Sequence, residues 1–452
     1  MEINKENLKE LANTIRILSA EAVQKANSGH PGLPLGAADF AAVLFAKHLR
    51  FDPTNTEWVN RDRFILSAGH GSMLLYSLLH LFGYDLSIDD LKNFRQLGSK
   101  TPGHPEFGYT VGVEATTGPL GQGFANGVGM GLSQKLLSSK YSKEVFDHNI
   151  YALVSDGDIM EGITAEAASL AGHLKLDNLI YLYDDNEICL ADSTDVCFTE
   201  DVGKRFESYG WYVQKIDGHD YDAVDKAIEN AKASDLPSII CCKTTKYSGK
   251  NIRFGVREHA MGSMVNGMSY TKHWLPYSAT FLVFSDYMRP VMRLAALSHI
   301  QAFYIFTHDS FWVGEDGPTH QPVEHVQSLR LIPGVYVFRP ADGEEVAMSY
   351  YAALKKSSSP SAFVFTRQNL PAIEKEVSAE VGVEKGAYCI SGSSNNEVIL
   401  LATGSELSLA VEASKKLESD GNFLLSSSMP CMGYFETRYA YNKSELFKPD
   451  SA

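Results

Sequence analysis

The chain has 452 residues, of which 44% are hydrophobic and 21% are charged, so it is long enough for two or three globular domains. Its 40 basic and 55 acidic side chains give a net charge of −15, which disfavours nucleic acid and anionic membrane surfaces as partners. The six cysteines form no C-x-x-C pair, no apolar run reaches bilayer length, and the N-terminus lacks a signal-peptide core, so we expect a reduced protein of the cytoplasm.

Helical and strand-like segments alternate along most of the chain. The N-terminus predicts an amphipathic helix, and between about 61 and 245 apolar runs of strand length alternate with helical periods, as in a parallel, doubly wound sheet. A second series of the same kind begins after 247, and a third starts at EVILLATGSELS. We therefore predict an α/β chain of two tandem doubly wound parallel-sheet domains, 1–246 and 247–385, with a partial third unit, 386–452. That last unit is too small to fold alone, so it must dock on something or be poorly ordered.

The strongest local signal is the pair of motifs LVSDGDIMEG (153–162) and YDDNEI (183–188). One strand-helix-strand crossover separates them, so Asp156 and Asn186 both follow the carboxyl ends of parallel strands, where open α/β sheets bind ligands. One carboxylate and one amide oxygen suit a Mg²⁺ ion whose other ligands are water and a bound diphosphate. Gly157 lets the backbone approach such a ligand closely. The alternative is an ordinary turn at a strand end.

Three histidines lie in glycine-flanked loops: His30 in SGHPG, His70 in AGHGS and His104 in PGHPE. A single histidine is more often a structural group than a catalyst, but three in this setting, without metal-ligand spacing, favour neutral donors to hydroxyls or phosphates. The loop GPLGQG (118–123) runs into a helix, and its backbone N–H groups could meet a phosphate or the edge of an aromatic ring. Taken alone, that loop is a weak signal.

The second half offers several polar and aromatic candidates. Glu258 in GVREHAMG starts a predicted helix, where an acidic side chain usually serves only the helix dipole. Three aromatic side chains occupy FLVFSDY near a predicted strand end, a pattern that normally indicates core; they are Phe281, Phe284 and Tyr287. The turn-rich loop GEDGPTHQP carries Asp316 and His320, and Arg367 in FTRQNLP suits a phosphate or carboxylate.

Ten motifs in order carry a resemblance to a known family: SGHPG, AGHGS, GPLGQG, SDGDIMEG, YDDN, GVREHAMG, SATFLVFSDYMRP, THDS, GEDGPTHQP and TRQNLP. They are similar to those of the transketolases, which are thiamine-diphosphate enzymes, and the resemblance covers nearly the whole chain. It implies that the first domain holds the cofactor diphosphate through a Mg²⁺ (or Ca²⁺) ion bound by Asp156, Asn186 and the backbone carbonyl of Ile188. It places near the cofactor His70, Gly157 and the loop from Gly118 to Leu120. It places near substrate hydroxyls, as catalytic residues, His30 and His104.

The resemblance also implies roles for the second domain. That domain would bind the aminopyrimidine ring, with Glu258 against its N1′ nitrogen and an aromatic pocket of Phe281, Phe284 and Tyr287. The sugar-phosphate channel would be lined by His308, Asp316, Arg367 and the catalytic His320. Similar enzymes are homodimers whose sites lie at the subunit interface, and their substrates are sugars or sugar phosphates.

The implied reaction is the transfer of a two-carbon ketol unit. The carboxyl group at the pyrimidine nitrogen favours a tautomer that removes the thiazolium proton, and the resulting ylide attacks a ketose carbonyl. Cleavage leaves a two-carbon enamine that an aldose accepts. Histidines suit this chemistry because protons must be both given and taken near neutral pH.

The sequence departs from the family pattern at several points. Lys246 runs straight into Tyr247, where similar enzymes carry a cofactor loop, a long linker and the opening of the second domain. Trp312 stands where the family has a small residue and would narrow the channel, and the third domain is cut to its first unit. Asp158 adds a negative charge beside the diphosphate loop, which is unfavourable unless a metal ion or a lysine offsets it.

Two readings of the function follow. The first is a shortened, working transketolase, and the second is a non-catalytic relic or paralogue that keeps the cofactor-site shell. A dihydroxyacetone synthase or a deoxyxylulose-phosphate synthase is a related alternative, although SATFLVFSDYMRP and TRQNLP disfavour the latter. We favour the working enzyme, because Glu258, Asp156, Asn186 and the aromatic pocket are all retained.

Overall fold

The structure is a computed structural model of the 452-residue chain and forms two compact units. Unit 1 comprises Met1–Arg257 with Glu315–Thr319, and unit 2 comprises Glu258–Gly314 with His320–Ala452. The residues described are 4–186, 188–189, 192–193, 198–244, 256–273, 275–375, 379–392, 398–420 and 424–436. The predicted junction after Lys246 lies outside the described residues. No helix in these ranges is both long and apolar enough to cross a membrane.

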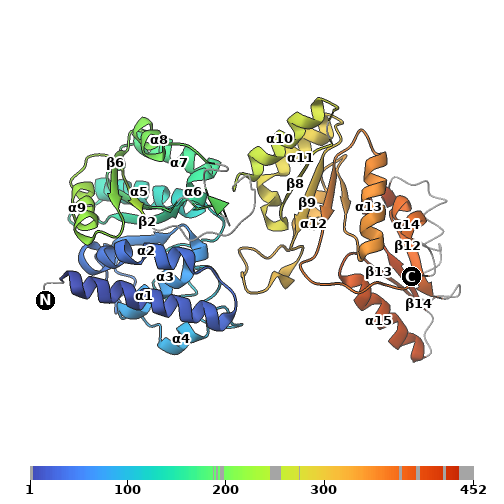
Figure 1. The fold of residues 1–452 in the computed structure, drawn as a ribbon, viewed down its shortest axis with the longest axis horizontal. Helices are drawn as coiled ribbons and strands as arrows, with labels where there is room; N and C mark the ends of the chain where they lie inside the picture. The colour runs from blue at the N-terminus through green and yellow to red at the C-terminus, as the bar shows by residue number, and fades with distance from the viewer. Residues whose placement is uncertain are drawn as a thin grey trace. The chain divides into compact units, whose positions relative to one another are not determined.

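Unit 1 is built on a five-stranded parallel sheet in the order β1-β2-β3-β7-β6 (Figure 1). Its strands are β1 (Arg63–Leu66), β2 (Ile150–Ser155), β3 (Leu179–Asp185), β6 (Tyr212–Asp217) and β7 (Ser238–Lys243). A two-stranded hairpin, β4 (Ile188–Cys189) and β5 (Asp192–Ser193), follows β3. Its α-helices are α1 (Lys5–Ala26), α2 (Gly32–Val43), α3 (Ser72–Leu81), α4 (Ile88–Lys92), α5 (Gln122–Lys140), α6 (Asp156–Met160), α7 (Gly162–His173), α8 (Val202–Ser208) and α9 (Tyr221–Lys232). A π-helix, η1 (Leu44–His48), follows α2, and a 3-10 helix, η2 (Gly69–Gly71), precedes α3.

Both faces of this sheet are covered by helices. Along β2, Tyr151 and Leu153 belong to the core shared with α1, α2, α3 and α9, whereas Ala152 and Val154 belong to the core shared with α5, α7 and α8. Successive side chains of a strand point to opposite faces, so this division marks a doubly wound domain, as predicted. Helix α1 is amphipathic, as predicted, and its buried face consists of Leu8, Ala12, Ile15, Ser19 and Ala22.

Unit 2 contains a four-stranded parallel sheet in the order β10-β11-β9-β8. Its strands are β8 (Tyr277–Phe281), β9 (Phe303–Thr307), β10 (Tyr336–Phe338) and β11 (Ser361–Val364), and its helices are α10 (Glu258–Tyr270), η4 (Leu282–Tyr287), α11 (Arg289–Leu297), η5 (Phe311–Val313), α12 (His325–Arg330) and α13 (Gly343–Lys355). The strand predicted over SATFLVFS ends at Phe281, and the chain turns there into the 3-10 helix η4. The predicted fold class is confirmed in both units.

Within unit 2, the C-terminal part packs against the four-stranded sheet. It comprises α14 (Ala379–Lys385), β12 (Tyr388–Gly392), β13 (Val398–Ala402), α15 (Glu406–Ser419), β14 (Leu424–Ser428) and α16 (Met432–Glu436), with a sheet order β12-β14-β13. Leu407 and Tyr434 share one hydrophobic core with Phe338 and Phe363 of the four-stranded sheet. The Glu345 carboxylate accepts hydrogen bonds from Tyr388 Oη at 2.8 Å and from Ser428 Oγ at 2.6 Å. This packing supplies the partner that a single strand-helix-strand unit needs.

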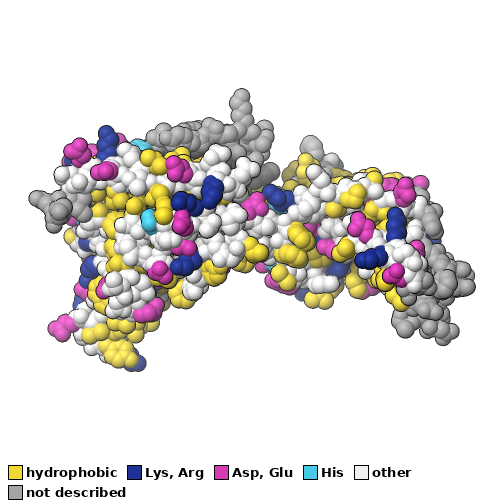
Figure 2. Space-filling model, turned by 90° about the horizontal axis from the view of Figure 1, so that it is seen from below, with side chains coloured by type: hydrophobic (Ala, Val, Ile, Leu, Met, Phe, Trp, Pro, Cys, Tyr) yellow, Lys and Arg dark blue, Asp and Glu magenta, His cyan; other side chains and the backbone are white. Residues whose placement is uncertain are grey.

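On the face drawn in Figure 2, acidic and basic side chains of the described residues are interspersed among apolar ones.

Candidate active site

Three predicted residues of unit 1 follow adjacent parallel strands. His70 follows β1, Asp156 begins α6 directly after β2, and Asn186 follows β3. Because β1, β2 and β3 are neighbours and run parallel, their carboxyl ends lie at one edge of the sheet. The predicted placement of Asp156 and Asn186 past strand ends is confirmed.

The carboxylate and the amide of the predicted metal site are held by neighbouring side chains. Asp156 is 2% exposed and accepts a hydrogen bond from the Tyr183 hydroxyl. Asn186 Nδ2 donates to Asp184 Oδ2 at 2.8 Å, and this bond assigns the amide oxygen to the acceptor role that a metal ion requires. Ile188 opens β4 two residues later, so its backbone carbonyl belongs to the same loop.

Sequence reasoning missed two residues that support this amide. Asp184 is fully buried at the end of β3, and burial raises its pKa to about 6. Thr244, which follows β7, donates its hydroxyl to Asp184 Oδ1 at 2.6 Å. The doubled aspartate in YDDN was the available signal. Nothing local pointed to Thr244, because it lies 60 residues further along the chain.

Burial raises the pKa of Asp158, as the predicted cost of its charge implies, and hydrogen bonds from neighbouring groups offset part of that cost. Asp158 is fully buried and accepts four hydrogen bonds at 2.6–3.0 Å. The donors are the Ser67 hydroxyl after β1, the Gly121 N–H before α5, and the N–H and hydroxyl of Ser155 at the end of β2. One carboxylate therefore ties three loops of this edge together. The same bonds occupy the Gly121 N–H, which is thus not available to a phosphate.

Glycines in the two cofactor motifs allow close packing. A Cβ on Gly157 would stand 2.7 Å from Leu120 Cδ1, so the predicted pair Gly157 and Leu120 is in contact. Gly118 has a φ of +146°, and its Cβ would stand 2.8 Å from Thr319 Oγ1 and 3.1 Å from the His104 ring. Side chains at these positions would force the loops apart, which explains the glycines.

Two of the three loop histidines are in ring contact, and the third bonds to the backbone of Asp316, all within unit 1. The rings of His30 and His70 meet edge to face with centroids 5.3 Å apart. His104 is 2% exposed, and its Nδ1 lies 2.6 Å from the backbone oxygen of Asp316. Desolvation, together with the positive charge of Arg95, lowers the pKa of His30 below 6.5, so its ring is neutral near pH 7. A neutral imidazole can both donate and accept a hydrogen bond.

The segment Glu315–Thr319 packs with unit 1, although the predicted boundaries put it in the second domain. Asp316 Oδ1 accepts from Arg95 Nη1 at 2.8 Å, and the Arg95 side chain is 2% exposed. The predicted channel residue Asp316 thus lies beside His104, and Arg95 is a third residue that sequence reasoning missed.

In unit 2, Glu258 has the properties of a functional carboxyl group. It is 7% exposed at the start of α10, and its Oε1 has one weak contact, 3.4 Å from Thr280 Oγ1. Its Oε2 is buried and makes no hydrogen bond within the described part of the chain. Burial raises the pKa of Glu258 above its usual 4.5. A residue serving only the helix dipole would be solvated, so the structure disfavours that explanation.

The predicted aromatic residues form one cluster with two of the predicted histidines. The Phe281 ring stacks on His308 with centroids 3.7 Å apart, and the Phe284 ring stacks on Tyr287 at 6.1 Å. His320 meets Phe284 edge to face at 5.5 Å. His308 has a φ of +60°, a conformation that costs a non-glycine residue free energy and that tends to occur at functional sites.

Two other predicted features lie on the surface of unit 2. Trp312 is 60% exposed and stacks on Phe311 with centroids 5.1 Å apart. Arg367 is also exposed, and its neighbour Gln368 donates to the Trp312 carbonyl at 2.7 Å. Arg367 and Trp312 therefore belong to connected loops.

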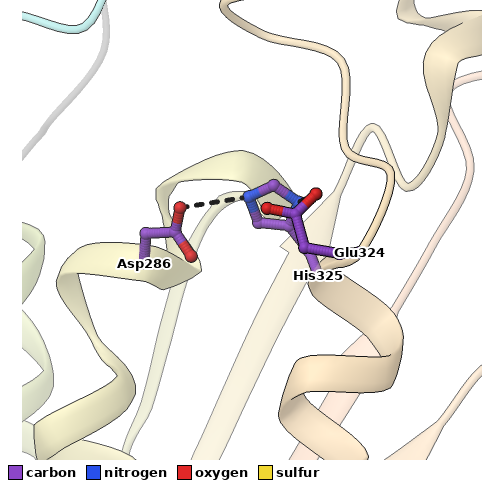
Figure 3. A group of neighbouring side chains, drawn as sticks. All are labelled: Asp286, Glu324 and His325. Carbon is purple, nitrogen blue, oxygen red and sulfur yellow. Dashed lines mark ion pairs between the residues drawn. The ribbon is translucent and has the colours of Figure 1, made fainter.

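A buried imidazole lies between two exposed carboxylates near the aromatic cluster (Figure 3). His325 Nε2 is 3.3 Å from Asp286 Oδ2, and His325 Nδ1 is 3.8 Å from Glu324 Oε2. These three side chains could be read as metal ligands. However, the carboxylates approach opposite nitrogens of the ring, and one ion can bind only one of these nitrogens. The two carboxylates therefore flank the imidazole, whose nitrogens make no hydrogen bond within the described residues, and the arrangement does not suit chelation.

Comparisons with known proteins agree on one family. Residues 7–295 match the family described as "Transketolase, thiamine diphosphate binding domain", and residues 386–452 match "Transketolase-like TK C-terminal domain". The chain is 40% identical to a transketolase of Halalkalibacterium halodurans, covering 97% of this chain and 89% of that protein, and 38% identical to one of Geobacillus stearothermophilus, covering 98% and 90%. The first alignment runs over 594 positions, more than the 452 residues present here, so that relative contains residues without a counterpart in this chain.

Solved structures give the same result. A transketolase from Campylobacter jejuni is 38% identical with a TM-score of 0.54, covering 98% of this chain and 91% of that one. A Pichia stipitis transketolase, solved in complex with sedoheptulose-7-phosphate, is 34% identical with a TM-score of 0.53, covering 97% and 88%. With the confirmed fold and the motifs in place, these matches show that the chain belongs to the transketolase family.

Proposed function

We propose that this protein transfers a two-carbon ketol unit from a ketose or ketose phosphate to an aldose or aldose phosphate, with thiamine diphosphate as cofactor. The observation that carries the proposal is Glu258, a buried carboxyl group with a raised pKa and an oxygen that makes no hydrogen bond within the described residues. Burying such a group without a partner costs free energy, which a ligand nitrogen would recover by bonding to it.

The residues of unit 1 fit the diphosphate end of the cofactor. A carboxylate from Asp156, an amide oxygen from Asn186 and the carbonyl of Ile188 are the oxygen ligands that Mg²⁺ or Ca²⁺ prefers. Close contacts at Gly118 and Gly157 shape the neighbouring loops, and His70 lies at the same edge. When bound, thiamine diphosphate supplies a carbon nucleophile and an electron sink for carbon–carbon bond cleavage.

The remaining predicted residues suit sugar recognition. We assign His30 and His104, with Asp316, to substrate hydroxyls, because a neutral imidazole and a carboxylate can each bond to a hydroxyl group. His308, His320 and Arg367 would serve the unit 2 side, where Arg367 offers a fork for phosphate. The sedoheptulose-7-phosphate complex of the Pichia stipitis relative supports a sugar phosphate as substrate. Phe281, Phe284 and Tyr287 would surround the aminopyrimidine ring, with Glu258 at its N1′ nitrogen.

Further parts of the proposal rest on the family rather than on contacts within this chain. We propose a cytoplasmic homodimer with sites at its interface, acting in the pentose phosphate pathway. We keep the division into a diphosphate-binding domain (1–246), a pyrimidine-binding domain (247–385) and a shortened C-terminal domain (386–452). The match of the C-terminal family to 386–452 supports the last boundary.

The proposal is tested by assaying purified protein with thiamine diphosphate and Mg²⁺ for ketol transfer from a ketose phosphate to an aldose. The key variant is Glu258→Ala, and the matched control is Glu6→Ala, which removes an exposed glutamate from the first turn of α1. Product from the parent and Glu6→Ala, with none from Glu258→Ala, supports the proposal. Stabilisation of the parent by cofactor without any product would contradict it and would identify a cofactor-binding relic.

A further inference from the structure

Arg95 is a buried arginine in an unfavourable backbone conformation. Its side chain is 2% exposed, and its φ is +61°, in the left-handed region that costs most residues free energy. It lies in the turn after α4, where its N–H donates to the Thr101 carbonyl at 3.0 Å. Such a conformation persists only where surrounding contacts enforce it. The contacts of the Arg95 side chain therefore show which part of the structure this strained turn supports.

Those contacts hold the segment Glu315–Thr319. Arg95 Nη1 donates to Asp316 Oδ1 at 2.8 Å and to Ser28 Oγ at 3.1 Å, and Ser28 Oγ in turn donates to Glu315 Oε1 at 3.3 Å. A Cβ on Gly103 would stand 3.2 Å from Arg95 Cζ and would overlap the Glu315 carbonyl, so glycine is required there. The Arg95 guanidinium, the Ser28 hydroxyl and the Gly103 backbone together hold this segment in place.

Asp316 balances the buried charge of Arg95. Nε and Nη2 of Arg95 are buried and make no hydrogen bond among the described residues. Asp316 is the carboxylate with which the guanidinium forms an ion pair, at 25% side-chain exposure. Loss of either partner would leave a poorly solvated charge, which makes the pair strongly coupled.

The same guanidinium acts on His30. The positive charge of Arg95 lowers the pKa of that imidazole, and the negative charge of Asp316 raises it. His104 completes the arrangement, because its Nδ1 bonds to the backbone oxygen of Asp316. Arg95 therefore touches one proposed substrate ligand and influences the protonation of another.

We propose that Arg95 is a positioning residue for the sugar: by pairing with Asp316 it fixes the segment Glu315–Thr319 beside His30 and His104, and so sets the affinity for substrate hydroxyls. This inference rests on the proposed function. It assigns to Arg95 no contact with substrate or cofactor.

The kinetic test uses Arg95→Met, Arg95→Lys, Asp316→Asn and the double variant Arg95→Met/Asp316→Asn. Arg95→Met raises KM for the aldose about tenfold or more and changes kcat less, because hydroxyl binding is lost rather than chemistry. Arg95→Lys recovers part of the affinity, and the double variant is no worse than Asp316→Asn. The control Arg16→Met breaks another largely buried pair of unit 1, with Asp39, and leaves KM unchanged. An Arg95→Met variant with KM within twofold of the parent would overturn the proposal.

A second measurement does not depend on turnover. NMR titration of His30, assigned with His30→Asn, is expected to show a higher pKa in Arg95→Met than in the parent. Thermal unfolding of the same four variants is expected to be non-additive, with the double variant losing less than the sum of the singles. If the parent makes no product, the proposed function fails while these measurements still test Arg95. An unchanged pKa of His30 together with additive melting shifts would overturn the positioning role.

Discussion

Asp158 provides the sharpest test of how unit 1 is held together. Its carboxylate accepts hydrogen bonds from Ser67, Gly121 and Ser155, at the ends of β1 and β2 and before α5. Burial raises the pKa of Asp158, which shows that desolvation opposes its ionisation. The substitution Asp158→Ala removes all four acceptor contacts and leaves the three loops without their common partner.

The size of the effect follows from the donors. The hydroxyl groups of Ser67 and Ser155 can rotate toward other acceptors, whereas the N–H groups of Gly121 and Ser155 cannot. Each buried donor without a partner costs about 1–3 kcal/mol, so the two N–H groups account for about 2–6 kcal/mol. The substitution also removes the desolvation cost of the buried carboxylate, which offsets part of this loss. We therefore expect the free energy of unfolding to fall by about 2–4 kcal/mol.

Denaturant unfolding followed by the fluorescence of Trp211 measures this loss, because Trp211 is 3% exposed in the core that includes Phe124 and Ile159. The matched control is Asp90→Ala. Asp90 occupies the same capping-box position at the start of α4, bonds to Ser87 and lies 4.0 Å from the exposed Lys100, so its loss costs about 1 kcal/mol. If Asp158→Ala costs no more than Asp90→Ala, the bonds to Ser67 and Gly121 do not stabilise the fold, and the reasoning fails.

Three further outcomes are expected. Gly118→Ala lowers the melting temperature by the equivalent of about 2 kcal/mol or more, because the new Cβ would overlap Thr319. The control Gly108→Ala is also at positive φ but in open space, and it costs about 1 kcal/mol. Equal losses in the two variants would count against the packing argument. Burial and nearby arginines lower the pKa of His148 from 6.5 in the unfolded chain to about 4 in the folded protein. The folded protein therefore loses stability as the pH falls from 6.5 toward 4. We expect a loss of about 1–2 kcal/mol at pH 5 in the parent and none in His148→Asn. Glu258→Gln abolishes ketol transfer yet raises the melting temperature at pH 8, because the raised pKa means that ionisation of Glu258 destabilises the fold as pH rises; a lower melting temperature would contradict this.

Much of the architecture was predictable from local patterns. Alternating strand-length and helical periods indicate βαβ units, and a parallel crossover brings successive strand ends to the same edge of a sheet. For this reason Asp156 and Asn186 could be placed correctly from two motifs thirty residues apart. The start of α10 at Glu258 was likewise visible, although its burial was not.

Other features depended on contacts between distant parts of the chain. Asp158 looked like an unfavourable charge because its donors lie up to 91 residues away, and Arg95 gave no signal because Asp316 is 221 residues further on. The sequence also did not predict that the C-terminal unit packs against the four-stranded sheet. Hydrophobic periodicity encodes which face of an element is buried, but it carries no information on which polar groups meet once the elements pack. Only the tertiary structure decides whether a buried charge finds its partners.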